Sequence, residues 1–389
     1  MTEADAEALA SDVSRAVALL EGEAGVHDVI RAVARMEPVA VRKISRATEL
    51  PVPIVAAVCG ELRKCGVIAK ERPVRLTPAG RSLFGFDSAA ASRDAGLTAG
   101  RADDDRLSEL DKVGERLTRI AAAAPAPRVE VDQMHCTVAT KLRRVLFMND
   151  SGALVNRRVL LLGDDDLISV TMHHFAQHCH LGAWLKELVV VDIDTAVLEY
   201  SRAQLVNAGF PVTFVQHDLR QPLPKDLTDR ADTIFTDPPY TQEAAELFLS
   251  RAASALAPGT GRHVFMSFGM KSPQVSLIVQ TAITTMGFVV RQLIRNFNEY
   301  LGAGALAGSS HLYHLASTNA TAPTINGPHS GRLYTGDRSP ARRYKCTACG
   351  AVEEVGANQR FRTIGQLKLR RCVACGGSTF RPLPRVAHS

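Results

Sequence analysis

The feature that most restricts the fold is a regular alternation, from residue 156 onward, of apolar strand-like runs with amphipathic helical segments. The expected strands are 157–163, 186–194, 211–220, 231–240, 262–269 and 288–300. Buried apolar strands that alternate with helices are typical of a parallel sheet covered on both faces. We therefore expect a doubly wound, Rossmann-like α/β domain that binds its ligands at the carboxyl ends of the strands.

The first expected strand ends at Gly163 and is followed by three acids, Asp164, Asp165 and Asp166. Nucleotide-binding α/β folds commonly have a glycine-rich turn here, which lets the backbone approach a phosphate or an amino-acid tail. Three carboxylates would instead repel an anion and attract a polycation. Helix capping accounts for one or two of them. We interpret the run as part of a ligand site.

Acids also end the second and third expected strands. An acid such as Asp192, 20 to 30 residues after the first turn, is well placed to accept hydrogen bonds from ribose hydroxyls. Asp194 fits a helix N-cap better than Asp192 does. Asp218 would lie near the adenine amino group of a bound nucleoside, and a turn-forming aspartate explains it equally well.

The fourth expected strand ends in Asp237-Pro238-Pro239-Tyr240. The two prolines fix φ and hold the chain open, so that Asp237 accepts hydrogen bonds from an amine and Tyr240 covers its cationic form. A plain strand-ending turn is the alternative. The same motif occurs in DNA methylases that act on exocyclic amines, so the motif by itself does not identify the substrate.

The segments LLLGDDDLIS, VVVDID, HDLRQPLP, TDPPYT, LFLSRA and MGF…FNEY, in this order, resemble the branched-chain polyamine synthase family, the N4-bis(aminopropyl)spermidine synthases. The likeness covers roughly 130–315. It implies a methyltransferase-like sheet, a homodimer, and transfer of aminopropyl groups from decarboxylated S-adenosylmethionine to a polyamine such as spermidine.

Carried over by residue, the resemblance assigns two sets of positions. The catalytic set is Asp164, Asp165, Asp237 and Tyr240. The set for the donor co-substrate is Gly163, Asp166, Asp192, Asp194, Asp218 and Pro238. The acids would accept the ammonium of a decarboxylated donor and repel the carboxylate of the intact one. The reaction itself requires no metal.

Two other functions remain open from the sequence. One is a transferase that uses intact S-adenosylmethionine to move a methyl or a 3-amino-3-carboxypropyl group. The other is a nucleic-acid-binding regulator or base methylase, which the acidic donor turn disfavours. In the helix after the acids, His174 and His178 are spaced for a metal, but no third ligand is evident.

The N-terminal residues 1–86 have the pattern of a winged helix-turn-helix domain. Three helices are expected within 27–68, followed by two short strands and a closing helix up to residue 85. The third helix has only Glu61, Arg63 and Lys64 as charged groups, which favours packing or dimerisation over DNA binding. Residues 87–129 are expected to be a linker and one helix, and 130–318 the catalytic domain.

The C-terminal residues 319–389 carry the pairs Cys346-x2-Cys349 and Cys372-x2-Cys375, each followed by glycine. Four thiolates from two such turns bind one tetrahedral zinc ion, so we expect a structural zinc ribbon. Its basic flanks account for much of the net charge of +6. They favour nucleic acid as a second possible partner, after the polyamine substrate.

The sequence also predicts the compartment. It has no apolar stretch of the length that a membrane span needs. The first residues, MTEADAEALASDVSRA, lack the charged-then-apolar order of a secretory signal. We expect a cytoplasmic protein with no membrane partner.

Overall fold

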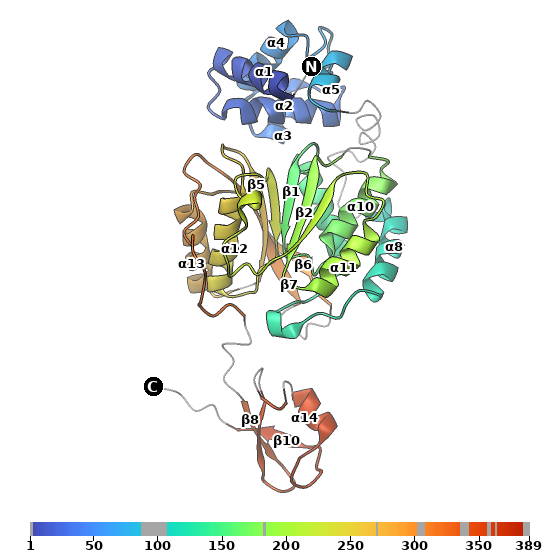
Figure 1. Ribbon diagram of the computed structural model, residues 1–389, viewed down its shortest axis with the longest axis vertical. Helices are drawn as coiled ribbons and strands as arrows, with labels where there is room; N and C mark the ends of the chain where they lie inside the picture. The colour runs from blue at the N-terminus through green and yellow to red at the C-terminus, as the bar shows by residue number, and fades with distance from the viewer. Residues whose placement is uncertain are drawn as a thin grey trace.

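The computed structural model describes residues 3–86, 107–181, 184–269, 271–301, 308–334, 342–355, 359–361 and 364–383. Along the chain they form an N-terminal helical unit (3–86), a central α/β unit (107–334) and a small C-terminal unit (342–383), as Figure 1 shows.

The N-terminal helical unit buries its own apolar core. Its helices are α1 (Glu3–Ala16), α2 (Gly22–Met36), α3 (Val41–Thr48), α4 (Val52–Lys64) and α5 (Pro78–Leu83). Helices α2 to α5 lie where the sequence predicted helices, whereas α1 was not predicted. The two expected strands are reduced to the isolated bridges Val39–Val74 and Ile68–Leu76.

The central sheet has seven strands in the order β3-β2-β1-β4-β5-β7-β6. They are β1 (Arg158–Leu162), β2 (Glu187–Asp192), β3 (Val212–Gln216), β4 (Thr233–Thr236), β5 (His263–Gly269), β6 (Val289–Glu299) and β7 (Ser309–Ala316). The first six lie within the predicted strands. The sequence analysis missed β7, which pairs antiparallel with both β5 and β6. The sheet is therefore mixed, with a parallel part formed by β1 to β5.

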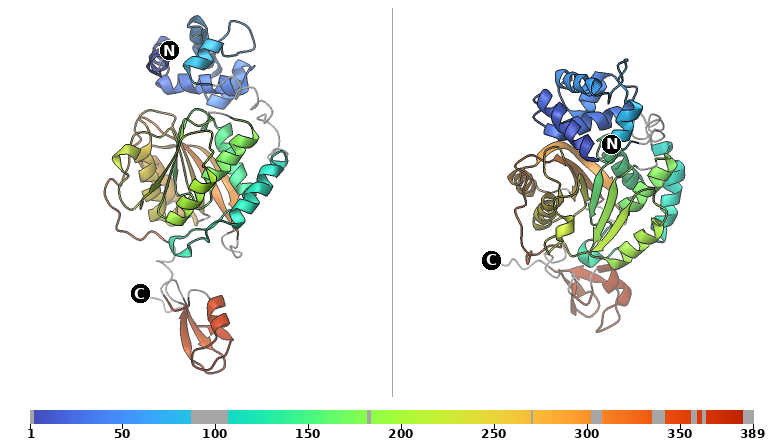
Figure 2. Two further views of the ribbon diagram at one scale, coloured as in Figure 1. Left: turned by 45° about the vertical axis from the view of Figure 1, so that its right-hand side comes forward. Right: turned by 45° about the horizontal axis from the view of Figure 1, so that its top comes forward.

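Alternating side chains of the parallel strands fill two apolar layers. Leu161 and Val190 point to one layer, and their neighbours Leu160 and Val189 point to the other. The first layer is closed by α8 (Asp111–Ala122), α9 (Val138–Asp150), α10 (Ile168–His178) and α11 (Thr195–Gln204). The second is closed by α12 (Gln242–Ala255) and α13 (Pro273–Thr285), and Figure 2 shows helices on both faces. Two short 3-10 helices, η2 (Val129–Val131) and η3 (Lys225–Leu227), lie in the connections.

Two segments that the sequence assigned elsewhere belong to the central unit. In α8, expected as part of a linker region, Val113 and Leu117 are buried in the first apolar layer. After β7, Leu333 is buried in the second layer, with Ile325 and Tyr334 packed against it. Side chains on both sides of the expected boundaries at 130 and 318 are thus buried in the layers of the central unit.

The C-terminal unit is a three-stranded sheet with one helix. Its elements are β8 (Arg342–Cys346), β9 (Val352–Val355), α14 (Ile364–Arg370) and β10 (Phe380–Pro382), and the strand order is β10-β8-β9. Among the described residues of this unit, Val355, Phe361 and Leu367 form the buried apolar cluster. So small an apolar core contributes little stability, and domains of this size commonly depend on a metal or a disulfide.

None of the helices in the described ranges combines the length and the apolar character that crossing a lipid bilayer requires.

We expect Gly287→Ala to destabilise the central unit much more than Gly152→Ala. Both glycines have a left-handed φ, +75° and +70°, so alanine costs roughly 1–2 kcal/mol at either position. At Gly287 a Cβ would also lie 2.5 Å from the carbonyl oxygen of Ala320, whereas at Gly152 it would meet nothing within 4 Å. Chemical denaturation should therefore show a loss larger by about 2 kcal/mol or more for Gly287→Ala. Equal losses would disprove this steric account.

Candidate functional site

A cleft of about 590 Å³, part of it open to solvent, lies at the carboxyl ends of β1 to β4. Five of the residues predicted for the site line it: Gly163, Asp165, Asp192, Asp218 and Asp237. Asp132 adds a fifth carboxylate to the wall. We call this the carboxylate cleft.

Gly163 opens the floor of the cleft. Its φ is +86°, and a Cβ built at this position would meet no atom within 4 Å. Its amide donates to the carbonyl of Val191 over 2.8 Å, which fixes the turn at the end of β1. The turn therefore leaves space where a side chain would otherwise stand, and a ligand can approach the backbone there.

The three consecutive acids separate into three different environments. Asp165 lines the cleft and accepts a hydrogen bond from the amide of Met134 over 3.3 Å. Asp164 is buried beneath it and accepts hydrogen bonds from the amide and the hydroxyl of Ser169, in the first turn of α10. The expectation that all three acids face the ligand is therefore corrected, because Asp164 has a capping role.

Asp166 is also turned away from the cleft. One of its oxygens accepts from the guanidinium of Arg144 over 2.6 Å, and the other accepts from the amide of Cys136 over 2.6 Å. The ammonium of Lys141 lies 3.5 Å away. Burial alone would raise the pKa of Asp166, but the charges of Lys141 and Arg144 outweigh it and lower this pKa to about 2. Asp166 is thus a permanent internal anion.

Arg144 joins the acids of two strand ends. Its guanidinium is fully buried and donates to Asp166 over 2.6 Å and to Asp237 over 2.7 Å. It also donates to Asn298 over 2.8 Å and to the hydroxyl of Tyr300 over 3.1 Å. This one side chain, which the sequence analysis did not single out, therefore fixes Asp237 at the edge of the cleft.

The DPPY turn differs from its expected arrangement. Pro239 lines the cleft, whereas Pro238 does not. The hydroxyl of Tyr240 donates to Asp237 over 3.2 Å, and its ring packs so closely on Gly269 that a Cβ there would lie 2.5 Å away. The cation over the Tyr240 ring is Lys271, at 5.9 Å. Tyr240 is therefore placed to orient Asp237, and its contact with a bound amine stays a prediction.

The second strand end supplies one cleft residue and one cap. Asp192 lines the cleft and accepts from the amides of Asp164 and Asp194, both over 2.8 Å. Asp194 lies outside the lining and caps α11 through the amide of Ala196 over 2.9 Å. Contact of Asp194 with the co-substrate stays a prediction, and the structure shows its capping role.

At the third strand end, Asp218 lines the cleft and is held by Arg220. It accepts from the amide of Arg220 over 2.9 Å and binds its guanidinium through both carboxylate oxygens. Burial would raise the pKa of Asp218, but these hydrogen bonds and the charge of Arg220 lower it. Asp218 therefore stays ionised in the cleft.

Among the acids that line the cleft, Asp165, Asp192 and Asp237 have raised pKa values, in each case with burial as the largest cause. Burial, followed by the negative charges of Asp166, Asp192 and Asp237, raises the pKa of Asp165 well above its usual range. Burial also raises the pKa of Asp237, although Arg144 opposes it. A raised pKa makes a carboxylate a stronger proton acceptor, which is the property that a general base needs.

Several lining residues escaped the sequence analysis. Tyr334 and Leu333 come from the segment after β7, and Phe248 comes from α12. No local signal marks them, because they reach the cleft through tertiary packing. The other lining residues that were not singled out are Val131, Asp132, Gln133, Val191, Ile193, His217 and Leu219.

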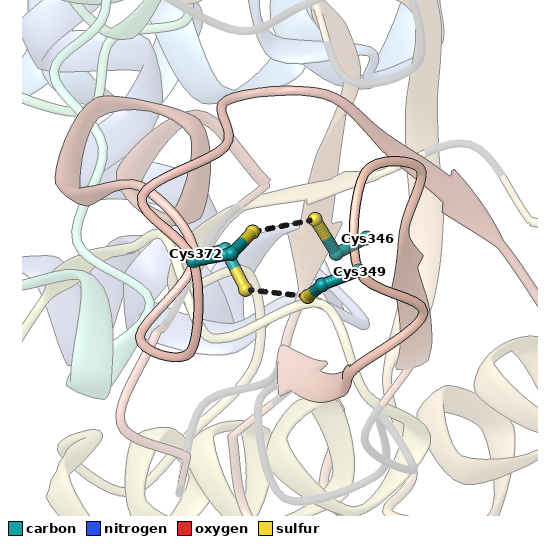
Figure 3. Close-up of side chains that lie close together, drawn as sticks. Cys346, Cys349 and Cys372 are labelled. Carbon is teal, nitrogen blue, oxygen red and sulfur yellow. Dashed lines mark hydrogen bonds between the residues drawn. The ribbon is translucent and has the colours of Figure 1, made fainter.

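The four paired cysteines come together in the C-terminal unit. Their sulfurs all lie within 4.8 Å of one another, and no other group of three or more possible metal ligands was found in the described ranges. The Sγ distances are 3.7 Å for Cys346–Cys375 and 3.6 Å for Cys349–Cys372, the two pairs joined in Figure 3. Four sulfurs at about 2.3 Å from a tetrahedral zinc would be about 3.8 Å apart, so the arrangement fits this ion.

We expect Asp164→Asn to become more stable relative to the wild type as pH rises. Burial raises the pKa of Asp164 from 3.8 to about 7. Below pH 3.8 the folded and unfolded chains both hold the proton of Asp164. Between pH 3.8 and about 7 only the folded chain holds it, so the free energy of unfolding of the wild type falls as pH rises through this range. That loss is on the order of 1 kcal/mol per pH unit, and neutral Asn avoids it.

Urea unfolding of both proteins at pH 5 and pH 7.5 measures this difference. Asp218→Asn is the control: Arg220 lowers the pKa of Asp218, so this acid stabilises the fold equally at both pH values, and its replacement should cost the same free energy of unfolding at pH 5 as at pH 7.5. A gap between Asp164→Asn and wild type that does not change with pH would contradict the expectation.

Comparisons with known proteins agree with the motifs. A sequence model described as the branched-chain polyamine synthase A C-terminal domain matches residues 112–323, more than half of the chain. An N(4)-bis(aminopropyl)spermidine synthase of Thermococcus kodakarensis is 32% identical over 67% of this chain and 74% of its own. An uncharacterized protein of Methanocaldococcus jannaschii is 33% identical over 97% of this chain and 93% of its own.

The fold has a solved counterpart. The branched-chain polyamine synthase of Thermus thermophilus, solved with N4-aminopropylspermidine and 5'-methylthioadenosine, aligns with a TM-score of 0.52 and 22% identity. The alignment covers 86% of this chain and 98% of that one. At this identity the likeness establishes that the two proteins share an α/β fold. The sequence matches show that the chain belongs to the branched-chain polyamine synthase family.

Proposed function

We propose that this protein transfers aminopropyl groups from decarboxylated S-adenosylmethionine to an amine of a polyamine such as spermidine. The observation that carries the proposal is the charge of the carboxylate cleft. Five aspartates line it, and none of the described residues of its wall is lysine or arginine. A cleft of this sign attracts a polycation and raises its local concentration.

The nucleoside part of the donor fits the half of the cleft formed by β2 and β3. Asp192 lies at the end of β2, and each of its oxygens accepts one backbone amide, which leaves lone pairs for ribose hydroxyls. Leu219 and Phe248 give this half an apolar surface for a flat base. Asp218, held by Arg220, would accept from the amino group of adenine.

The reacting amine fits the other half, between Asp165 and Asp237. The neutral amine nitrogen attacks the carbon next to the sulfonium, a C–N bond forms, and the C–S bond breaks. Sulfur keeps the bonding pair, so methylthioadenosine leaves uncharged. The proton released from nitrogen passes to Asp165 or Asp237, whose raised pKa values suit this transfer.

The same acids would select the donor. The aminopropyl tail of the decarboxylated donor ends in an ammonium, which Asp165 and Asp237 attract. Intact S-adenosylmethionine adds a carboxylate, and like charges in a partly desolvated site cost several kcal/mol. If this repulsion costs the intact donor about 2.7 kcal/mol or more, the decarboxylated donor is preferred by at least about a hundredfold.

The decisive measurement is kcat/KM for both donors with spermidine as acceptor, using mass detection of the products. Asp165→Asn should lower turnover with the decarboxylated donor by about two orders of magnitude. It should also reduce the ratio of kcat/KM for the decarboxylated donor to kcat/KM for intact S-adenosylmethionine. Asp226→Asn, an exposed acid of η3, is the matched control and should change neither value. Equal or better use of intact S-adenosylmethionine would replace this function with 3-amino-3-carboxypropyl or methyl transfer.

We also propose that the C-terminal unit is a zinc ribbon with one structural zinc bound by Cys346, Cys349, Cys372 and Cys375. The two cysteine turns have the same geometry. The amide of Gly350 donates to the backbone carbonyl oxygen of Cys346, and the amide of Gly376 donates to that of Cys372. Both glycines have a left-handed φ. Four thiolates complete a tetrahedral shell, so no position is left for a substrate. The ribbon's role is therefore structural.

Metal analysis of the purified protein should give one zinc per chain. Cys349→Ser should lose the zinc and unfold the C-terminal unit, because binding of structural zinc contributes directly to folding. Cys65→Ser, an exposed cysteine of the N-terminal helical unit, is the control and should keep the metal. A zinc-free wild-type protein would end this proposal.

For the N-terminal helical unit we propose a winged helix-turn-helix domain that packs within the protein instead of binding DNA. The basic groups of α4 are already engaged: Lys64 pairs with Glu61 over 2.7 Å, and Arg63 donates to the carbonyl of Ala69 over 3.3 Å. Meanwhile Arg35 of α2 donates to the carbonyls of Asn149 and Asp150, at the end of α9. These contacts support a role in holding the two units together.

A homodimer and a cytoplasmic location complete the proposal. At the free edge of the sheet, β6 exposes Val289, Val290 and Leu293, and the neighbouring helix α13 exposes Leu277 and Ile278. Apolar exposure of this kind on an edge strand suits contact with a second copy. A reducing compartment such as the cytoplasm keeps the four thiolates available for zinc.

A further inference from the structure

A second cavity lies at the opposite end of the sheet from the carboxylate cleft, between the N-terminal helical unit and the central unit. Its empty volume is about 430 Å³. Figure 1 shows the helices of residues 3–86 above this end of the strands. Helix α2 contributes Asp28, Arg31 and Arg35, while the central unit contributes Arg157, His263 and Arg291. We call it the arginine cavity.

The charges on its wall do not balance. Four guanidinium groups line the cavity with a single carboxylate, Asp28. Asp28 is shared, because one of its oxygens accepts from Arg157 over 2.6 Å and from Arg31 over 3.3 Å. Arg291 pairs with Glu49 over 2.7 Å at the rim. Arg31 and Arg157 therefore share one carboxylate, which leaves one positive charge in excess between them.

Arg31 is the least satisfied of these groups. Only 12% of its side chain is exposed, and its buried Nε has no hydrogen-bond partner among the described residues. Burial, followed by the charge of Arg157, lowers the pKa of Arg31 to about 9. An enclosed cation of this kind gains free energy when an anion enters beside it.

His263 adds a polar group without adding charge. Burial, followed by the charge of Arg157, keeps the pKa of its imidazole well below the usual value, so the ring is neutral. Arg157 lies 3.3 Å from its Nε2 and donates to it. The hydroxyl-bearing residues Thr48 and Ser151 also reach the wall. Guanidinium forks with nearby hydroxyls are the groups that bind oxyanions well.

We propose that the arginine cavity is a binding site for a phosphate group, separate from the catalytic cleft. The anion would contact arginines of both units at once and thereby strengthen the contact between the N-terminal helical unit and the central unit. A ligand that binds only the folded, docked protein raises its thermal stability with concentration. The proposal concerns the phosphate group, which a free ion or a phosphate ester can both supply.

Thermal unfolding of the full chain tests the site, with inorganic phosphate compared against chloride at equal ionic strength. Phosphate at about a hundred times its Kd stabilises by about 2.7 kcal/mol and should raise Tm by several degrees. Arg31→Gln should abolish this rise. Because Arg31 is enclosed, Arg291→Gln at the rim, 22% exposed, is the second variant and should weaken phosphate binding about tenfold or more in titration calorimetry.

The matched control is Arg230→Gln, a 47% exposed arginine paired with Glu187 on the surface of the central unit, which should keep the full response. Glycerol 3-phosphate, an ester without a nucleoside that could bind the carboxylate cleft, forms the second arm. Tighter binding of this ester than of inorganic phosphate identifies an ester as the ligand, and the reverse identifies the free ion. No stabilisation of the wild type by either probe, or an unchanged response in both cavity variants, would overturn the proposal.

Discussion

The arrangement of the cleft depends on one buried guanidinium. Arg144, on α9, lies between Asp166 after β1 and Asp237 after β4, and it also bonds Asn298 near the end of β6. Three segments far apart in the sequence are thereby fixed to one planar group with five donors. Removal of one partner from such a buried network costs about 3–5 kcal/mol, because the charges left behind have no solvent. Arg144 therefore fixes the geometry of the carboxylate cleft although it does not line the cleft.

This arrangement explains how an acid-rich turn remains folded. Asp166 is neutralised by Arg144 and Lys141, and Asp164 is buried with a raised pKa and bonded to Ser169. Only Asp165 of the three reaches the cleft. Asp166 is thus paired with cations, Asp164 caps a helix, and Asp165 faces the ligand site. The protein thereby avoids three adjacent, unpaired negative charges at the end of one strand.

The sequence predicted the parallel strands and the cysteine pairs because both signals are local. Apolar runs mark β1 to β5, and the spacing of each cysteine pair fits a metal-binding turn. It did not predict β7, because the segment SSHLYHLA has polar and histidine residues among its apolar ones. It also could not separate the roles of Asp164, Asp165 and Asp166, since an aspartate that caps a helix and one that faces a ligand have the same local pattern. Arg144 escaped for a similar reason, because its partners lie 22 and 93 residues away.

The segment after β7 has a further geometric consequence. It runs along the central unit as far as Tyr334 in the wall of the cleft, and the first strand of the four-cysteine unit begins at Arg342. Eight residue steps of fully extended chain span at most about 28 Å. The C-terminal unit is therefore tethered within that radius of the cleft wall. A short tether keeps its basic surface at an effective concentration of the order of millimolar beside the acidic opening, whatever the concentration of the protein in solution.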